Sequence, residues 1–367
     1  MTGFGGPPAH IALLRELVVE RMGWMDASSF EDANAACGLL PGPASTQLAI
    51  LCAYRVAGGA GAIVGGLGFI IPAVAIIIPL SAVFLAQAPP RWVVGAGAGA
   101  GAAVAAVAVH AARGLLGPSL ERARADGPRR ARWALYLLSG TVAAVLTGPY
   151  LVIVLLGCGA FELLMQRRRW AHGQGSDKAG GFLIPASVSS GGLGALAWTA
   201  LKVGALSFGG GFVIIPLMQG DAVHVYHWMT NAQFLNAVAL GQVTPGPVVA
   251  TVAAVGYAAD GVPGALLAAG VAFAPSFCFI LLGGRRFEQL RQNPRPRAFL
   301  AGAGPAAIGA ILGAAVTLMA ALQEGWQFGV LAAAAVALLA ANSGVVQTLL
   351  GAAAAGVLFA LAGAPLP

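Results

Sequence analysis

The sequence predicts an all-α polytopic membrane protein with two homologous halves in an inverted-topology repeat, each containing a re-entrant Pro-Gly-Pro helical hairpin. Three observations support this prediction. Hydrophobic residues make up 58% of the 367 residues, and charged residues only 9%. The same unusual residues recur 204 positions apart, and basic residues occupy opposite loops in the two halves.

The apolar runs indicate membrane helices. Residues 60–86, 92–116, 264–282 and 298–322 are close to the length of roughly 20 residues that crosses a bilayer. A soluble domain carries roughly 25% charged residues, so this chain has too few polar side chains to cover one large soluble core. The net charge of +7 does not indicate nucleic-acid binding, because the arginines lie in short loops between apolar runs. The four cysteines lie singly in apolar segments and are interpreted as small hydrophobic residues, not metal ligands or disulfides.

The repeat divides the chain into two halves. At an offset of 204 without a gap, Trp24-Met25 aligns with Trp228-Met229, and Pro41-Gly42-Pro43 aligns with Pro245-Gly246-Pro247. Such matches are informative in an alanine-rich chain, in which matches of alanine are not. We therefore expect an N-terminal repeat over residues 1–165, a basic cytoplasmic linker over 166–190, and a C-terminal repeat over 191–367.

The basic loops predict that the two halves insert in opposite directions. The loop at residues 113–132 holds six arginines, and its counterpart around 323–325 holds no basic residue. Conversely, the second-half loop at 285–297 holds five arginines, and its counterpart at 87–91 holds one. Because positive residues favour the cytoplasmic side, matched loops should lie on opposite sides of the membrane. Such inverted repeats are typical of secondary transporters, whose binding site lies where the repeats meet.

Each Pro-Gly-Pro corner joins two short apolar segments. These are residues 27–40 and 44–57 in the first half, and 231–244 and 248–260 in the second. A helix of about 14 residues is about 21 Å long, and it does not cross a hydrocarbon core of about 30 Å. We therefore expect two re-entrant hairpins. Irregular backbone at membrane depth is tolerated where it is buried or lines a cavity, which makes both corners candidate sites.

The corners have the features of an anion site. Gly42 and Gly246 permit the turn, and Pro43 and Pro247 suit the first position of a new helix. A helix N-terminus presents unpaired N–H groups and the positive end of a dipole, which bind anions without a charged side chain. The alternative is that the corners only break helices for packing. The candidate substrate-binding residues at the corners are Pro41, Gly42, Pro43, Ser45, Thr46, Gln47, Gln242, Thr244, Pro245, Gly246, Pro247 and Thr251.

Two glycine runs, a lysine and a histidine are further candidates. Glycine runs inside apolar segments unwind a helix or admit another backbone. Lys202 lies within an apolar segment, where a lysine is costly and by default a functional candidate; the alternative is a lysine that snorkels to an interface. His10 is a candidate hydrogen-bond donor or proton relay, or else a packing histidine. This second set of candidates consists of Gly5, Gly6, Pro7, His10, Lys202, Gly209, Gly210 and Gly211.

Other classes of chemistry are not indicated. Carboxylates are scarce in the apolar segments, and cation transport usually needs buried carboxylates, so an anion substrate is favoured. The glycine-rich run at residues 95–101 lies in an apolar segment with no preceding strand, so helix packing explains it better than nucleotide binding. Catalytic and metal-binding motifs lack a supporting context. We expect neither an enzyme nor a cofactor nor a metal site.

The motifs together resemble the long, two-domain form of the chromate ion transporter family over nearly the whole chain. The motifs are Phe4-Gly5-Gly6-Pro7, Pro41-Gly42-Pro43, Phe208-Gly209-Gly210-Gly211 and Thr244-Pro245-Gly246-Pro247. The resemblance implies a multi-pass carrier in the inner (plasma) membrane that exports chromate, uses an ion gradient and confers chromate resistance. The position matching Lys202 would fall before Met1, so we expect the first helix of the N-terminal repeat to be truncated.

Two alternatives stay open. A carrier of sulfate or another oxyanion would use the same donors, because helix-terminus donors distinguish poorly between tetrahedral dianions. An intramembrane enzyme or lipid-handling protein would need a nucleophile or metal cluster, which the sequence does not indicate. The expected partners are a chromate-like or sulfate-like oxyanion and the lipid bilayer, with no nucleic acid. A coupling proton and a homodimer are left open.

Overall fold

The computed structural model of the chain is helical throughout the residues that it describes. These are residues 6–38, 40, 42–86, 88–123, 127–147, 150–170, 192–207, 212–283 and 294–367. Within them the regular secondary structure is all helix, which confirms the predicted all-α class.

The helices of the first half follow the predicted segments closely. They are α1 (Gly6–Arg15), the π-helix η1 (Glu16–Arg21), α2 (Ala27–Cys37), α3 (Ala44–Phe84), α4 (Arg91–Ala123), α5 (Gly127–Leu146) and α6 (Leu151–Trp170). α6 continues beyond the predicted start of the linker at residue 166, because glutamine and arginine are good helix formers. Residues 171–191, the rest of the predicted linker and the first residue of the C-terminal repeat, lie outside the described residues.

The second half repeats this order. It contains α7 (Leu193–Leu206), α8 (Ile214–Gln219), the π-helix η3 (Gly220–Val225), α9 (Asn231–Val243), the 3-10 helix η4 (Val248–Ala250), α10 (Thr251–Gly283), α12 (Pro294–Ala320), α13 (Gly325–Leu339) and α14 (Val345–Leu361). The two π-helices begin 204 positions apart, as do α2 and α9. The fold therefore repeats the local backbone features of the sequence repeat.

The helix lengths and surfaces fit a multi-pass membrane protein. Among the described residues, α3, α4, the span Val248–Gly283 and α12 are long and apolar enough to cross a membrane. Four shorter apolar helices accompany them, over Leu151–Gln166, α7, α13 and α14. Large apolar side chains such as Leu146, Leu282 and Leu361 are 72–84% exposed, which a bilayer tolerates and water does not favour. The predicted polytopic membrane class is confirmed.

The short limbs of both hairpins end where the sequence predicts. α3 leaves helical geometry at Ala57 and Gly58, where Gly58 has a φ of 61°. α10 does the same at Asp260 and Gly261, where Gly261 has a φ of 59°. Each corner is therefore followed by a limb of 13 or 14 residues and a sharp kink, after which the long helix continues in a new direction.

The second helix of each half begins with a side-chain cap. Asp26 caps α2 by accepting a hydrogen bond from the Ser29 backbone N–H, and Thr230 caps α9 in a capping box with Gln233. Hydrogen bonds from Ser28 Oγ and from the backbone and hydroxyl of Ser29 hold the pKa of the Asp26 carboxyl well below its usual range. The two caps fix the start of each hairpin at equivalent positions.

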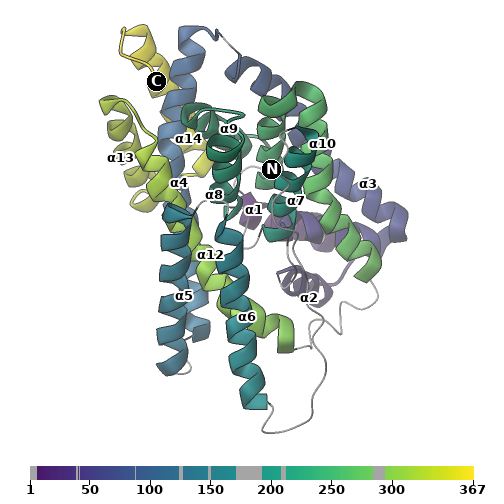
Figure 1. Cartoon of the computed structure of the whole chain (residues 1–367). Helices are drawn as coiled ribbons and strands as arrows, with labels where there is room; N and C mark the ends of the chain where they lie inside the picture. Colours follow the sequence, from purple (N-terminus) through teal and green to yellow (C-terminus); the bar gives the residue numbers. More distant parts are fainter. Residues whose placement is uncertain are drawn as a thin grey trace.

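The two halves exchange their C-terminal hairpins. α12 packs against α5 and α6 of the first half, and α4 packs against α13 and α14 of the second (Figure 1). In these contacts the two backbones lie close together. A Cβ on Gly309 would lie 1.9 Å from the Leu137 carbonyl oxygen, and a Cβ on Gly356 would lie 2.0 Å from the Gly95 carbonyl oxygen. The glycine-rich run at residues 95–101 is thus a helix-packing surface, as predicted.

Replacing Gly356 by alanine is expected to lower the free energy of unfolding by about 1–3 kcal/mol, because the added Cβ overlaps the Gly95 carbonyl. Gly351 is the matched control on the same helix. A Cβ there meets nothing within 4 Å, so Gly351→Ala should be neutral or slightly stabilising. Thermal unfolding of the purified variants in detergent checks this difference. An equal loss in both variants would contradict close packing of α14 on α4.

Candidate functional site

A cavity of about 1210 Å³ lies between the first Pro-Gly-Pro corner and helices α4, α5, α6 and α12. Three basic side chains, Arg122, Arg129 and Arg297, line it, and both Arg122 and Arg297 are exposed. Gly42 and Ala44, which are at most partly exposed, line it at the corner. The cavity therefore connects a basic, solvent-exposed region to the N-terminus of α3.

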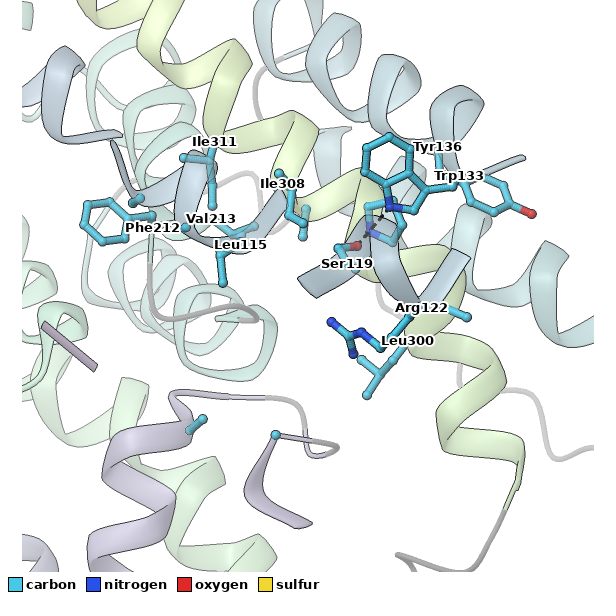
Figure 2. Close-up of a pocket in the computed structure, with 18 of the residues that line it drawn as sticks. Leu115, Ser119, Arg122, Trp133, Tyr136, Phe212, Val213, Leu300, Ile308 and Ile311 are labelled. Carbon is cyan, nitrogen blue, oxygen red and sulfur yellow. Dashed lines mark hydrogen bonds between the residues drawn. The ribbon is translucent and has the colours of Figure 1, made fainter. Parts of the chain in front are cut away.

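The cavity wall between these two regions is largely apolar. Figure 2 shows Leu115, Phe212, Val213, Ile308 and Ile311 on one side, and the Arg122 guanidinium extending from its helix into the open space. Behind Arg122, Trp133 Nε1 donates a 2.9 Å hydrogen bond to Ser119 Oγ. Apolar walls lower the local dielectric, which strengthens the attraction of the arginines for an anion that enters.

The first corner is built around a glycine that no other residue replaces without strain. Gly42 has a φ of 120°, a conformation that favours glycine. A Cβ at this position would lie 2.6 Å from Gln47 Nε2, 3.3 Å from the Gly204 carbonyl oxygen and 3.5 Å from Ser276 Oγ. The corner therefore touches α7 and α10 of the other half.

The prolines occupy a slightly different place from the one predicted. Pro43 and Pro247 are the N-cap residues of their helices, not the first helical residues, because their ψ angles of 102° and 132° are extended. The helix after Pro247 also begins as a 3-10 turn, whereas α3 begins directly as an α-helix at Ala44. The unpaired N–H groups of a long α-helix consequently follow the first corner.

The polar residues after the first corner are deeply buried. Ser45, Thr46 and Gln47 are each at most 4% exposed, and the Thr46 hydroxyl has no hydrogen-bond partner among the described residues. Gln242, which lines the cavity from α9, has an Nε2 that likewise has no partner there. Thr46 does not itself line the cavity, but it follows Ala44, which does. Buried donors without partners are costly, so donors at these positions point to a polar ligand.

The polar residues of the second corner bond to their own backbone. The Thr251 hydroxyl donates to the Val248 carbonyl at 2.7 Å, and the Thr244 hydroxyl donates to the Gly241 carbonyl at 3.5 Å. Among the predicted second-corner candidates, only Gln242 lines the cavity; Thr244, Pro245, Gly246, Pro247 and Thr251 do not.

The structure describes only part of the glycine motifs. Gly6 and Pro7 are the first two residues of α1, so the chain is helical there and not unwound. His10 is 2% exposed and packs edge-on against Phe69 with ring centroids 5.3 Å apart, while its neighbour Ile11 lines the cavity. The predicted site residues Gly5, Pro41, Gly209, Gly210 and Gly211 lie outside the described residues.

Lys202 forms an ion pair that the sequence did not reveal. Its Nζ lies 2.5 Å from Asp221 Oδ2, with side chains only 13% and 3% exposed, and Asp221 also accepts a 2.8 Å hydrogen bond from Thr199. Asp221 lies in η3, is 2% exposed and bonds to Thr199 of α7. Neither Lys202 nor Asp221 lines the cavity, so the role of Lys202 in substrate binding stays a prediction.

Glu162 is a second buried carboxylate, and it lines the cavity. It accepts hydrogen bonds from Arg132 Nε at 2.9 Å, from the Tyr136 hydroxyl at 2.8 Å and from Gln166 Nε2 at 3.0 Å. Its charge is therefore neutralised by Arg132, and it does not repel an anion from the cavity. No group of three or more His, Cys, Asp or Glu side chains among the described residues could hold a metal ion.

Replacing either Lys202 or Asp221 by alanine should lower the free energy of unfolding by about 3 kcal/mol, because the other buried charge is left without a partner. The double variant Lys202→Ala/Asp221→Ala should lose clearly less than the sum of the two single variants. Denaturant or thermal unfolding measures the three values. The exposed pair Arg21–Glu16 is the control, and Arg21→Ala should cost at most about 1 kcal/mol. Additive losses for Lys202 and Asp221 would contradict direct pairing.

Comparisons with known proteins identify relatives of the chain. The chain is 32% identical to the "Chromate transport protein" of Cupriavidus metallidurans over 86% of this chain and 79% of that protein. It is 29% identical to the "Probable chromate transport protein" of Synechococcus elongatus over 86% of this chain and 81% of that protein, and 30% identical to the "Chromate transport protein" of Pseudomonas aeruginosa over 85% and 76%. No solved structure matches the chain.

The family match covers both halves. The profile of the family described as "Chromate transporter" matches residues 1–163 and again residues 194–358. These two segments contain both corners, the residues that line the cavity from α4 and α12, and the buried pair in α7 and η3. The chain is therefore a transporter and not an enzyme, and it belongs to the chromate transporter family.

Proposed function

We propose that the protein is a secondary active carrier that exports chromate across the inner (plasma) membrane and thereby confers chromate resistance. The observation that carries the proposal is the cavity that runs from three arginines to the N-terminus of α3. Chromate is a tetrahedral dianion, and this cavity supplies attraction at the exposed region and uncharged donors at the buried corner.

The basic loops support export as the direction of transport. Arg122 and Arg129 belong to the loop region at 113–132, and Arg297 belongs to the loop at 285–297. The positive-inside rule assigns both regions to the cytoplasm, and in the structure they surround one cavity. The end of α4 and the start of α12 thus meet, as expected if these two matched helices run in opposite directions across the membrane. An anion from the cytoplasm would enter this cavity first.

The uncharged donors suit a carrier. A lysine in contact with a dianion would hold it strongly, but the ammonium of Lys202 is paired with Asp221. Helix-terminus N–H groups and hydroxyls bind more weakly, so the substrate is released when the site opens to the other side. Energy for export against a gradient has to come from a coupled ion, for which we propose the proton.

Inside-out membrane vesicles containing the protein should accumulate labelled chromate saturably, and more of it when a proton gradient is imposed. Such vesicles expose the cytoplasmic face, so export appears as uptake. Sulfate at increasing concentration is the competing oxyanion. Saturable sulfate transport that chromate does not inhibit would contradict the proposal, as would chromate uptake no greater than in vesicles without the protein.

A variant pair tests the role of the basic region in the same vesicles. Arg122→Gln should raise the KM for chromate at low ionic strength, and the difference should shrink at high salt because exposed charges are screened. Arg21→Gln is the matched control, since Arg21 is exposed but does not line the cavity. Equal effects of the two variants would contradict entry through this cavity.

A further inference from the structure

We propose that the two Pro-Gly-Pro corners are not equivalent: the oxyanion binds at the first corner alone, and Ser276 of the second half completes its site. This proposal rests on the proposed function and specifies the substrate-binding residues. The second corner is then a structural element that braces α3.

Ser276 is placed to act on a ligand at the first corner. It lies on α10, is 0% exposed, and its hydroxyl has no hydrogen-bond partner among the described residues. Its Oγ would lie 3.5 Å from a Cβ built on Gly42, and Gly42 itself lines the cavity. A serine hydroxyl without a partner among the described residues therefore lies beside Gly42, which lines the cavity, although Ser276 itself is not a lining residue.

Thr46 adds a second hydroxyl to the first turn of α3. It too is 0% exposed and has no partner for Oγ1 among the described residues. The hydroxyls of Ser276 and Thr46 come from opposite halves of the protein. The first turn of α3, which directly follows the corner, adds backbone N–H groups that have no partner within the helix. A tetrahedral oxyanion can accept hydrogen bonds from several such donors at once, and it removes the cost of burying them.

The second corner lacks each of these features. A Cβ on Gly246 would meet Ala73 Cβ at 2.6 Å and the Phe69 carbonyl oxygen at 3.6 Å. Beyond the kinks the repeat offset is 203, so Ala73 is the counterpart of Ser276 and provides no hydroxyl. Val249 and Ala250 replace Ser45 and Thr46, again without hydroxyls.

Gln242, which precedes the second corner, lines the cavity, but the threonines of the corner bond to their own backbone. The first turn after Pro247 is a 3-10 turn, and the Thr251 hydroxyl donates to the Val248 carbonyl. No described residue from Thr244 to Thr251 lines the cavity. The first corner thus has two buried hydroxyls without partners among the described residues, and it lines the cavity through Gly42 and Ala44. The second corner has an apolar contact with Ala73 of α3.

Binding of labelled chromate and sulfate to the purified full-length protein in lipid nanodiscs tests this assignment. Ser276→Ala should raise the Kd for chromate roughly ten-fold, the effect of losing one hydrogen bond to a charged ligand. Ser276→Thr keeps the hydroxyl and should restore most of the affinity. Ser81→Ala is the matched control, because Ser81 is another fully buried serine whose hydroxyl has no partner among the described residues, but it lies near the C-terminal end of α3, away from the corner.

The outcomes separate this proposal from the proposed function. A wild-type protein that binds neither oxyanion would overturn the proposed function itself. Wild-type binding of chromate with an unchanged Kd in Ser276→Ala would overturn only the assignment of the first corner. Equal losses in Ser276→Ala and Ser81→Ala, with equally lowered melting temperatures, would show a general packing effect and would also overturn it. Thr46→Val provides a second variant at the same corner if Ser276→Ala fails to fold.

Discussion

Close backbone contact between small residues is the constraint on which the rest of the structure depends. Lipid does not drive apolar helices together as water does, so helices in a membrane associate by packing. Here glycines let α4 approach α14, and let α12 approach α5 and α6, so closely that a Cβ added at these glycines would overlap atoms of the neighbouring helix. Each of these contacts joins one half to the other, so the C-terminal hairpins are exchanged between the halves.

The exchange explains why a binding site can form between the halves. α4 and α12 are held together by partners from both repeats, and the cavity lies along them, with arginines from both basic loop regions. The first corner meets this cavity and packs on α7 and α10, which belong to the other half. In the proposed carrier, a site shared in this way would change shape when the halves move relative to each other, as alternating access requires.

The sequence predicted the helices well and their partners poorly. Hydropathy, the 204-residue repeat and the Pro-Gly-Pro motifs are local signals, and they correctly predicted the short limbs that end at Gly58 and Gly261. The pair between Lys202 and Asp221 was missed, because the hydropathy of 221–227 indicates a loop and gives no sign of the π-helix that buries Asp221. Ser276 was missed for a similar reason: a single serine in an apolar helix carries no signal until packing places it beside Gly42.

The central claim is that a tetrahedral oxyanion binds at the N-terminus of α3, within reach of Ser276. A crystal structure of the protein with bound chromate, with the chromium atom located by its anomalous scattering, tests this most directly. The expected result is one chromium peak within hydrogen-bonding reach of the first turn of α3 and of Ser276 Oγ. A peak beside Gly246 and Ala73, or a peak only among the arginines Arg122, Arg129 and Arg297, would contradict the claim.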